Sequence, residues 1–173
     1  VGGGLSMNCG AFGRELADVV EYVDLLIDGK VERVYAKDLG FAYRHSKVKE
    51  LGVAIGASVK LAAGNKNRIA KDMKGYAIAR GKSQPKGKSL GSVFKKAGDV
   101  SAGYFIDRAG LKGYRIGGAQ ISQMHANFII NTDGATSADF LRLADYARQE
   151  VDKRFGVKLK YEIEYLPAVS TIL

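Results

Sequence analysis

Residues 136–156 read TSADFLRLADYARQEVDKRFG and carry the clearest helical pattern in the chain. Thr136 or Ser137 can cap the start, because a side-chain oxygen there can accept a hydrogen bond from one of the first backbone amides. Gly156 suits the position after the last turn, where the backbone becomes left-handed. Apolar side chains recur along one face at Phe140, Ala144, Ala147, Val151 and Phe155. The stretch therefore predicts an amphipathic helix packed on a core.

The residues around this helix predict a small sheet. Residues 157–166, VKLKYEIEYL, alternate apolar and charged side chains, which is typical of a strand with one buried face. Residues 125–134 indicate a strand that runs into a turn, and residues 101–113 indicate a short helix that ends at Gly110. From about residue 83 the sequence thus predicts an α+β lobe with helices packed against a sheet.

Toward the N-terminus the pattern changes from helix to sheet. Residues 81–91, GKSQPKGKSLG, predict a loop at a boundary between two lobes, and residues 65–80 have apolar side chains near helical spacing. Residues 19–36 predict two strands around Asp28-Gly29. Residues 52–62 alternate in the way a half-buried strand does, so the first third of the chain is expected to be mostly sheet.

The chain opens with a segment rich in glycine. Residues 1–13 hold five glycines and indicate a loop that turns tightly or lets a ligand approach closely. The first residue is Val1, and the basic flank and apolar core of a secretory signal are both missing after it. We therefore expect the sequence to be the interior of a longer protein.

The composition argues against several classes of protein. No run of 18 apolar residues occurs, so no membrane span is expected. The single cysteine, Cys9, cannot form an internal disulfide, and the two histidines show no spacing typical of a zinc site. We expect a globular protein of the cytoplasm that holds no metal.

Positive charge is concentrated in one segment. Residues 60–96 contain eleven Lys and Arg against the single acid Asp72, whereas the rest of the chain has 16 basic and 17 acidic residues. A localised positive field predicts an anionic partner, either a phosphorylated small molecule or a nucleic acid. The alternative is a lysine-rich helix face that contacts only solvent.

Three positions offer chemistry without forming a nucleophile motif. Ser92 lacks the second glycine of a GxSxG elbow, because Phe94 stands in that place, so a turn or cap role competes with a catalytic one. Glu162 is either a solvated strand charge or an acid. Arg44, beside Tyr43, is either a salt-bridge partner or an anion site.

Six ordered motifs resemble the UDP-N-acetylenolpyruvoylglucosamine reductase family, in its shorter branch. They are VGGGLSMNCGAFGREL (1–16), LGFAYRHS (39–46), GSVFKK (91–96), AGLKGYRIGGAQIS (109–122), HANFIIN (125–131) and FGVKLKYEIEY (155–165). The resemblance covers essentially the whole chain. It implies an enzyme of bacterial peptidoglycan synthesis that uses FAD and NADPH to reduce the enolpyruvyl ether of UDP-N-acetylglucosamine to UDP-N-acetylmuramate.

The resemblance also implies how the chain is organised. Residues 1–80 would form the C-terminal part of a FAD-binding domain with the vanillyl-alcohol-oxidase-type fold. Residues 81–166 would form a small α+β substrate-binding domain, and residues 167–173 a C-terminal tail. The family's N-terminal flavin subdomain would precede Val1, so a missing flavin-binding segment or chain is an implied partner.

The same resemblance gives roles to the three chemical positions. The arginine of the family's YR motif matches Arg44, which implies an electrostatic clamp on a developing enolate. The serine of its GS motif matches Ser92, which implies a proton donor to the enolate carbon. The acid of its last strand matches Glu162, which would polarise the same region or complete the acid pair.

Binding residues follow from the resemblance as well. The flavin-contacting loop would include Gly3, Gly4, Asn8 and Gly10, and Cys9, where the family usually has alanine, would be a small buried residue. The implied substrate-binding residues are Tyr43, Lys82, Gln84, Lys95, His125 and Asn127. The sequence departs from the family at Lys96-Ala97, where Asn-Pro or Arg-Pro is common, and at Glu164, where arginine is usual.

Two other functions stay open at this point. The chain could be a catalytically silent relative or a substrate-binding fragment without flavin, as the absent N-terminal subdomain suggests. A nucleic-acid-binding module would use the basic segment 60–96. However, only Tyr76 and Phe94 are interleaved there as aromatic residues, and no RNP, KH or zinc pattern occurs, so we expect no nucleic-acid partner.

Overall fold

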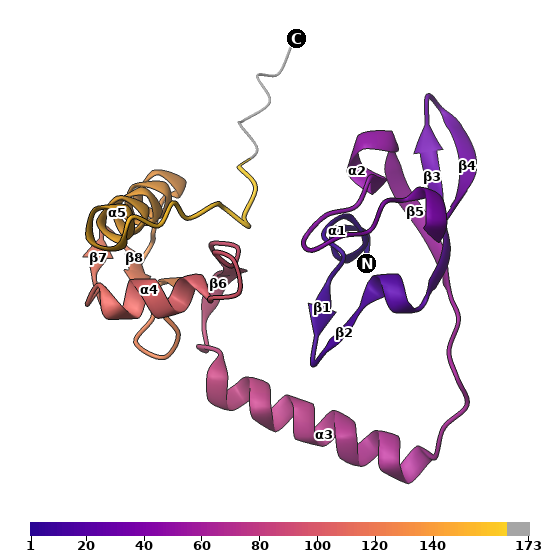
Figure 1. The fold of residues 1–173 in the computed structure, drawn as a ribbon, viewed down its shortest axis with the longest axis horizontal. Coiled ribbons are helices and arrows are strands. Elements are labelled where there is room, and N and C mark those ends of the chain that lie inside the picture. The colour runs from indigo at the N-terminus through magenta and orange to yellow at the C-terminus, as the bar shows by residue number, and fades with distance from the viewer. Residues whose placement is uncertain (166–173) are drawn as a thin grey trace. The chain divides into compact units, whose positions relative to one another are not determined.

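The computed structural model describes residues 1–165. The chain divides into two compact units, Val1–Tyr76 and Ala77–Leu173, and the division falls within one long helix, α3 (Lys66–Ser83) (Figure 1). Each unit has its own hydrophobic core, and the two cores share no residue. The predicted α+β class is confirmed, whereas the predicted tail at residues 167–173 lies outside the described part of the chain.

A three-stranded antiparallel sheet, in the order β4–β3–β5, forms the base of the first unit. Its strands are β3 (Val20–Ile27), β4 (Lys30–Tyr35) and β5 (Val53–Val59). Asp28 and Gly29 join β3 to β4 with φ angles of 48° and 77°, the left-handed pair that a two-residue hairpin turn requires. The hairpin predicted around Asp28-Gly29 is confirmed.

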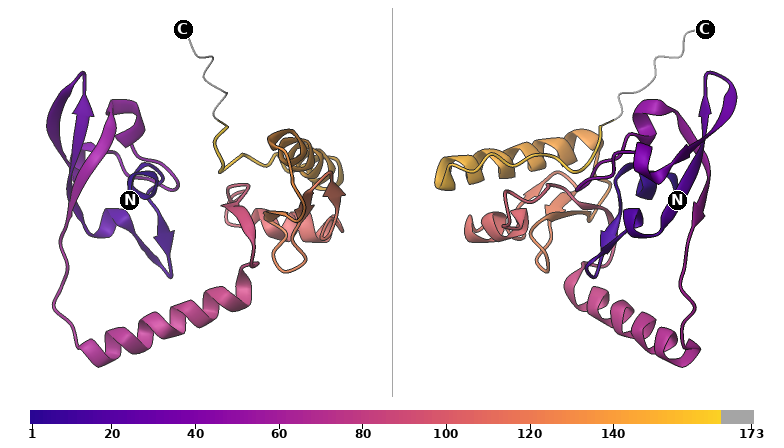
Figure 2. Two further views of the ribbon diagram at one scale, coloured as in Figure 1. Left: turned by 180° about the vertical axis from the view of Figure 1, so that it is seen from behind. Right: turned by 45° about the vertical axis from the view of Figure 1, so that its right-hand side comes forward.

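Two short helices, α1 (Gly2–Ser6) and α2 (Val48–Leu51), cover one face of this sheet (Figures 1 and 2). The buried apolar side chains between them are Leu5, Val20, Val23, Leu25, Leu39 and Val48. A small hairpin, β1 (Gly10–Ala11) with β2 (Arg14–Glu15), follows α1. Short 3-10 helices at Leu16–Asp18 and Ala36–Asp38 complete the unit.

The strand β5 corrects one expectation. Its residues alternate as predicted, but the apolar set faces outward, with Val53 65% and Ile55 55% exposed within the described residues. The inward positions hold small residues such as Ala54. A Cβ added to Gly2 of α1 would lie 4.0 Å from the Ala54 Cβ. The close approach of α1 therefore requires small side chains on the inner face and leaves the larger ones outside.

The helix α3 confirms the helical spacing of residues 65–80 and shortens the loop predicted after it. None of its residues is buried. Residues 81–83 belong to its last turn, and Lys88–Ser92 form the strand β6, so only residues 84–87 connect the two elements. The prediction of a loop throughout 81–91 is wrong, because Gly, Ser and Lys at these positions are compatible with a helix end and an edge strand.

The second unit is a four-stranded antiparallel sheet in the order β6–β9–β8–β7 with two helices. Besides β6, its strands are β7 (Arg115–Ile116), β8 (Ala119–Ile121) and β9 (Phe128–Asn131), and its helices are α4 (Ala102–Arg108) and α5 (Ser137–Phe155). Its core includes Val93, Phe94, Ile106, Ile121, Leu143 and Val151.

The helix α5 begins and ends where the sequence predicts. The Thr136 hydroxyl accepts a hydrogen bond from the Asp139 amide at 3.1 Å, and the Asp139 carboxylate accepts one from the Thr136 amide at 3.1 Å. Gly156 has a φ of 65° and ends the helix. The apolar stripe also includes Leu143, which is fully buried.

The strand predicted at 157–166 is wrong as a regular element. Within the described residues its backbone pairing consists of a single antiparallel bridge between Phe94 and Tyr161 and the hydrogen bonds next to it. Leu159 is buried in the core. The alternating pattern therefore reflects burial of one side of the segment, although no partner strand pairs with it along its described length. Residue 166 lies outside the described residues.

Candidate functional site

The glycine-rich segment folds into α1 and the turn that follows it. A side chain on Gly3 would point into open space, with no heavy atom within 4 Å of its Cβ. On Gly4 a Cβ would lie 3.3 Å from Leu16 Cδ1, and on Gly10 it would lie 3.2 Å from the Arg14 carbonyl oxygen. Of the three glycines implied in flavin contact, Gly3 thus faces outward, whereas Gly4 and Gly10 are needed for packing within the unit.

Asn8 cross-links this segment from inside. The side chain is 1% exposed, and its Oδ1 accepts a hydrogen bond from the Ala17 amide at 3.0 Å. Its Nδ2 donates to Glu15 Oε2 at 2.7 Å and to the Ala42 carbonyl oxygen at 3.2 Å. Both amide hydrogens therefore have partners within the chain, and the side chain shapes the loop.

Cys9 corrects a second expectation, because it is exposed and not buried. Its backbone amide donates to the Gly4 carbonyl oxygen at 2.8 Å, and its carbonyl oxygen accepts from the Leu16 amide at 3.1 Å. These bonds hold the backbone inside the turn and direct the thiol outward.

Arg44 lies in a tight turn that is tied to the same segment. Ala42 and His45 exchange two backbone hydrogen bonds, of 3.0 and 3.1 Å, around Tyr43 and Arg44. Arg44 has a φ of 52°, a left-handed conformation that is uncommon for residues other than glycine. Backbone strain of this kind persists where the surrounding structure enforces it, and it clusters at functional sites.

The Arg44 side chain extends toward the glycine-rich segment. Its Nη1 lies 3.7 Å from where a Cβ on Gly10 would stand, and its Cζ lies 5.2 Å from the centroid of the Tyr43 ring. The buried Ser46 hydroxyl donates to the Leu5 carbonyl oxygen at 2.8 Å and anchors the turn to α1. The structure thus brings together Arg44, Tyr43 and Gly10 within the first unit.

Ser92 ends the strand β6 directly after an irregularity in the ladder. Ser89 pairs with Ile130 and Ser92 with Phe128, so β6 contains one more residue than β9 over this interval. Gly91 adopts a φ of 83° there. Such bulges bend a strand and redirect the next side chain, and they occur often beside active sites. Ser92 is half-buried.

Glu162 lies on the segment next to Ser92 in the second unit. Its backbone amide donates to the Val93 carbonyl oxygen at 2.8 Å, and the Lys95 amide donates to the Lys160 carbonyl oxygen at 2.9 Å. The residue that follows Ser92 therefore accepts a hydrogen bond from Glu162 itself. Of the implied catalytic residues, Ser92 and Glu162 are brought together by the second unit, and Arg44 belongs to the first.

Of the implied substrate residues, Tyr43 lies in the first unit and the other five lie in the second. Lys82 and Gln84 lie at the end of α3, where Gln84 Oε1 accepts from Arg80 Nη2 at 3.2 Å. His125 lines a cavity of about 200 Å³ together with Lys112. Burial lowers the pKa of His125 below its ordinary value, and the charge of Lys112 acts in the same direction to a smaller extent. Asn127 is 5% exposed, and its side chain bonds to the backbone of Phe94.

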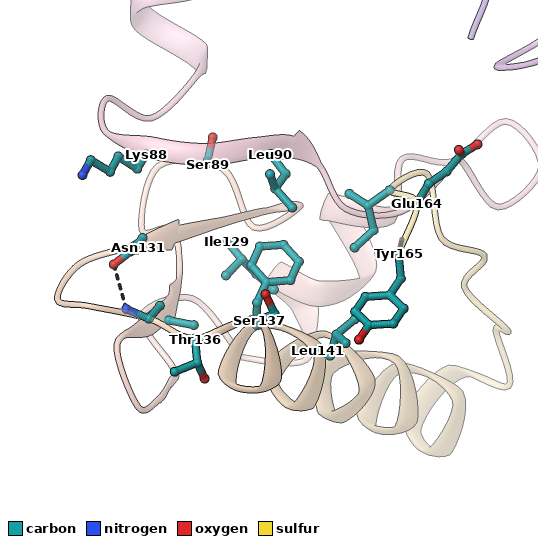
Figure 3. A pocket seen from close by; sticks show the side chains of 14 residues that line it. Lys88, Ser89, Leu90, Ile129, Asn131, Thr136, Ser137, Leu141, Glu164 and Tyr165 are labelled. Atoms are coloured by element: carbon teal, nitrogen blue, oxygen red, sulfur yellow. Dashed lines mark hydrogen bonds between the residues drawn. The ribbon is translucent and has the colours of Figure 1, made fainter. Parts of the chain in front are cut away.

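A second, larger cavity was missed by the sequence reasoning. It has a volume of about 590 Å³ and lies between β6, β9 and the first turns of α5 (Figure 3). Its lining combines an apolar floor, including Ile129, Phe140 and Leu141, with polar groups such as Lys88 and Asn131. Five separate segments contribute to it, and neither Ser92 nor Glu162 lines it, so no local motif could have indicated it.

Two classes of site are not found in the described part of the chain. No cluster of three or more His, Cys, Asp or Glu side chains within residues 1–165 could hold a metal ion. Among the helices of the same residues, none is long and apolar enough to cross a membrane.

Comparisons with known proteins agree with the motifs. Residues 84–166 match the family described as UDP-N-acetylenolpyruvoylglucosamine reductase, C-terminal domain. A UDP-N-acetylenolpyruvoylglucosamine reductase from Geotalea uraniireducens is 41% identical over 164 residues, which are 94% of this chain and 55% of the relative. The enzyme of the same name from Heliobacterium modesticaldum is 39% identical over 170 residues, 96% of this chain and 54% of the relative.

A solved structure is similar as well. The crystal structure of UDP-N-acetylenolpyruvylglucosamine reductase from Thermus caldophilus matches with a TM-score of 0.86 and 38% sequence identity, over 96% of this chain and 60% of that one. The chain therefore spans about half the length of the curated relatives it matches, and 60% of this solved structure.

Proposed function

Because the chain belongs to the UDP-N-acetylenolpyruvoylglucosamine reductase family, whose C-terminal domain it carries at residues 84–166, we propose that it takes part in the FAD-dependent, NADPH-using reduction of the UDP-N-acetylglucosamine enolpyruvyl ether to UDP-N-acetylmuramate. This reaction belongs to peptidoglycan synthesis and would take place in the cytoplasm. The observation that carries the proposal is that Ser92 and Glu162 lie on hydrogen-bonded neighbouring segments of the family domain.

The first unit fits the proposed cofactor through its shape. Gly3 faces open space that a side chain would fill, and the Arg44 guanidinium lies beside Gly10. Gly3 and the backbone next to it would hold the flavin, whereas Asn8, Gly4 and Gly10 would shape the loop. When bound, FAD reduced by NADPH supplies the hydride. The vanillyl-alcohol-oxidase-type fold of residues 1–80 is part of the same proposal.

The proposed chemistry of the protein residues concerns the charge and the proton. Hydride addition to the enolpyruvyl double bond leaves negative charge on the carbon next to the carboxylate. The permanently charged guanidinium of Arg44 would stabilise this enolate. The Ser92 hydroxyl would donate its proton to the carbon, since an enolate carbon is basic enough to accept a proton from a serine, and solvent would then reprotonate Ser92. Glu162 would polarise the same region.

The basic residues serve the diphosphate in this proposal. Lys82 and Lys95 would bind phosphate oxygens as point charges, with Gln84, Tyr43 and His125 as further substrate contacts. The positive segment 60–96 then has a small-molecule partner and no nucleic-acid partner.

A second function is favoured by one observation. Residues 84–166 match the family's C-terminal domain by themselves, and a protein that uses only this domain would bind the nucleotide sugar without holding flavin. In that case, as in a catalytically silent relative, the substrate site would persist and turnover would be absent.

Isothermal calorimetry tests the proposal. The chain is titrated with the UDP-N-acetylglucosamine enolpyruvyl ether at low and moderate salt, with a short single-stranded oligonucleotide as the control. Saturable binding of the nucleotide sugar without preference for the oligonucleotide is expected. Oligonucleotide binding with a steep salt dependence and no nucleotide-sugar binding would overturn the proposal. Turnover with added FAD and NADPH then distinguishes the reductase from the substrate-binding fragment.

A further inference from the structure

The segment that follows Ser92 is held by one buried side chain. Val93 and Phe94 are 1% and 2% exposed. Asn127 Oδ1 accepts a hydrogen bond from the Phe94 amide at 3.0 Å, and Asn127 Nδ2 donates one to the Phe94 carbonyl oxygen at 2.8 Å. The Asn127 carbonyl oxygen also accepts from the Val93 amide at 2.9 Å. Asn127 alone thus binds the backbone amide and carbonyl oxygen of Phe94 and the backbone amide of Val93.

The opposite edge of the same strip carries Glu162. Glu162 donates its backbone amide to the Val93 carbonyl oxygen at 2.8 Å, and the Phe94 ring stacks on Tyr161 with ring centroids 5.1 Å apart. The Tyr161 hydroxyl donates to the Asp145 carboxylate at 2.8 Å, which holds Tyr161 against α5. Residues 93–95 are therefore a central strip, with Asn127 on one edge and residues 160–162 on the other.

This pair of bonds requires an uncharged side chain with one donor and one acceptor. The Phe94 backbone presents a donor and an acceptor, and a carboxamide offers an acceptor and a donor at matching positions. An ionised carboxylate would place a second acceptor against the Phe94 carbonyl oxygen, and an alanine would leave both groups without a partner. At 5% exposure, and with both ends of the amide engaged, the Asn127 side chain is poorly placed to bind substrate directly.

We propose that Asn127 is a positioning residue, which acts through the 93–95 strip to fix Ser92 relative to Glu162. This inference rests on the proposed function, since it assigns the strip a purpose in proton donation. A displacement of a reacting group by about 1 Å can slow a reaction on the order of a hundredfold. Loss of the amide should therefore lower the rate of turnover much more than the affinity for substrate.

The test compares Asn127→Ala and Asn127→Asp with two controls in the same unit. Val151→Ala removes methyl groups from the buried side of α5 and lowers the stability of the same core without removing a hydrogen bond of the strip. Gln120→Glu makes the matching change from amide to carboxylate on the neighbouring strand β8, where Gln120 Nε2 donates to the Gly113 carbonyl oxygen at 3.0 Å. The full chain is assayed with FAD, NADPH and the enolpyruvyl ether, and substrate affinity is measured by calorimetry.

For both Asn127 variants we expect kcat to fall about 10- to 100-fold while the dissociation constant for substrate changes by less than about threefold. The controls should keep kcat within about twofold, although Val151→Ala lowers the unfolding temperature. Amide hydrogen exchange provides a second readout that needs no turnover. The Phe94 and Glu162 amides should lose protection together in Asn127→Ala and keep it in both controls.

Each outcome decides a separate claim. If wild-type protein turns over and Asn127→Ala turns over equally fast, the inference is overturned and the proposed function stands. If the Phe94 amide keeps its protection from exchange in Asn127→Ala, Asn127 does not hold the 93–95 strip, and the inference is overturned. If wild-type protein binds no substrate and shows no turnover, the proposed function fails, and the role of Asn127 in proton donation fails with it.

Discussion

At the scale of single residues, Arg44 shows a conflict between backbone conformation and side chain. Its φ of 52° costs an L-residue about 1 kcal/mol or more relative to glycine. Arg44→Gly should therefore keep the free energy of unfolding or raise it by up to about 1 kcal/mol, while turnover falls about a hundredfold or more because the guanidinium is lost. Urea unfolding and steady-state assays measure the two effects.

Asp28→Gly is the matched control for Arg44→Gly. Asp28 also has a positive φ, 48°, but it lies in the turn between β3 and β4 and has no proposed role in the reaction. The same relief of strain should leave turnover unchanged. A marked loss of stability in Arg44→Gly would show instead that the arginine side chain maintains the fold.

Tyr161 makes one part of the stability depend on alkaline pH. Burial, followed by the hydrogen bond to Asp145, raises the pKa of Tyr161 to about 12 from its ordinary value of 10.0. The folded state favours the neutral phenol of Tyr161 more than the unfolded state does. The contribution of Tyr161 to the free energy of unfolding is therefore complete below pH 10 and is lost as the pH rises toward 12. We expect the unfolding midpoint of wild-type protein to fall more steeply over this interval than that of Tyr161→Phe.

The comparison uses urea midpoints at several pH values, with Tyr165→Phe as a control at a ring that is 62% exposed. Tyr165→Phe should follow the wild-type curve. Parallel curves for wild-type protein and Tyr161→Phe would contradict the assignment of this alkaline component to Tyr161.

At the scale of elements, the β-bulge before Ser92 is a feature that a substitution can test directly. Gly91 has a φ of 83°, and a Cβ there would meet no heavy atom within 4 Å, so its only requirement is conformational. Gly91→Ala should lower the free energy of unfolding by about 1–2 kcal/mol and reduce kcat, because relaxation of the bulge turns the Ser92 hydroxyl. Urea unfolding and steady-state kinetics measure both changes.

Gly98→Ala serves as its matched control. Gly98 has a φ of 60° and equally open surroundings, but it lies beyond the strip that joins Ser92 to Glu162. A similar loss of stability with unchanged kcat is expected. If the two variants lose kcat equally, the effect of Gly91→Ala comes from general destabilisation and not from the bulge.

Elements whose information is local could be predicted from the sequence. The caps at Thr136 and Gly156 and the turn at Asp28-Gly29 set the limits of α5 and the β3–β4 hairpin, since each depends on a few adjacent residues. The direction of the apolar face of β5 could not be read from alternation, because it depends on how closely α1 approaches Ala54. The prediction of a strand at 157–166 was wrong for a similar reason, because a strand needs a partner strand, and the local alternation does not show whether one lies beside it.

The candidate site follows the same rule. Arg44, Ser92 and Glu162 were identified through a resemblance that depends on ordered motifs, and their environment then came from the fold. The approach of Arg44 to Gly10 joins residues 34 positions apart, and the bonds between Asn127 and Phe94 span 33. Such long-range contacts leave no periodic pattern in the sequence. Residue spacing therefore does not distinguish a side chain that binds a ligand from one that stabilises the fold.

At the scale of the whole molecule, two cores without a common residue predict that stability is distributed between the units. Leu25 and Leu143 are both fully buried, the first in the core of Val1–Tyr76 and the second in that of Ala77–Leu173. Replacing a buried leucine by alanine costs about 2–5 kcal/mol, and effects of distant sites without shared partners add. Leu25→Ala should therefore destabilise the first unit and Leu143→Ala the second.

Native-state hydrogen exchange distinguishes the units, because each core contains amides that exchange only when that core opens. Leu25→Ala should accelerate exchange at Val23 and leave Ile121 unchanged, and Leu143→Ala should do the reverse, so each variant is the control for the other. Equal acceleration at both positions in both variants would mean that the chain unfolds as one cooperative body. Independent opening would instead allow the unit that carries Ser92 and Glu162 to keep its geometry when the unit that carries Arg44 is destabilised.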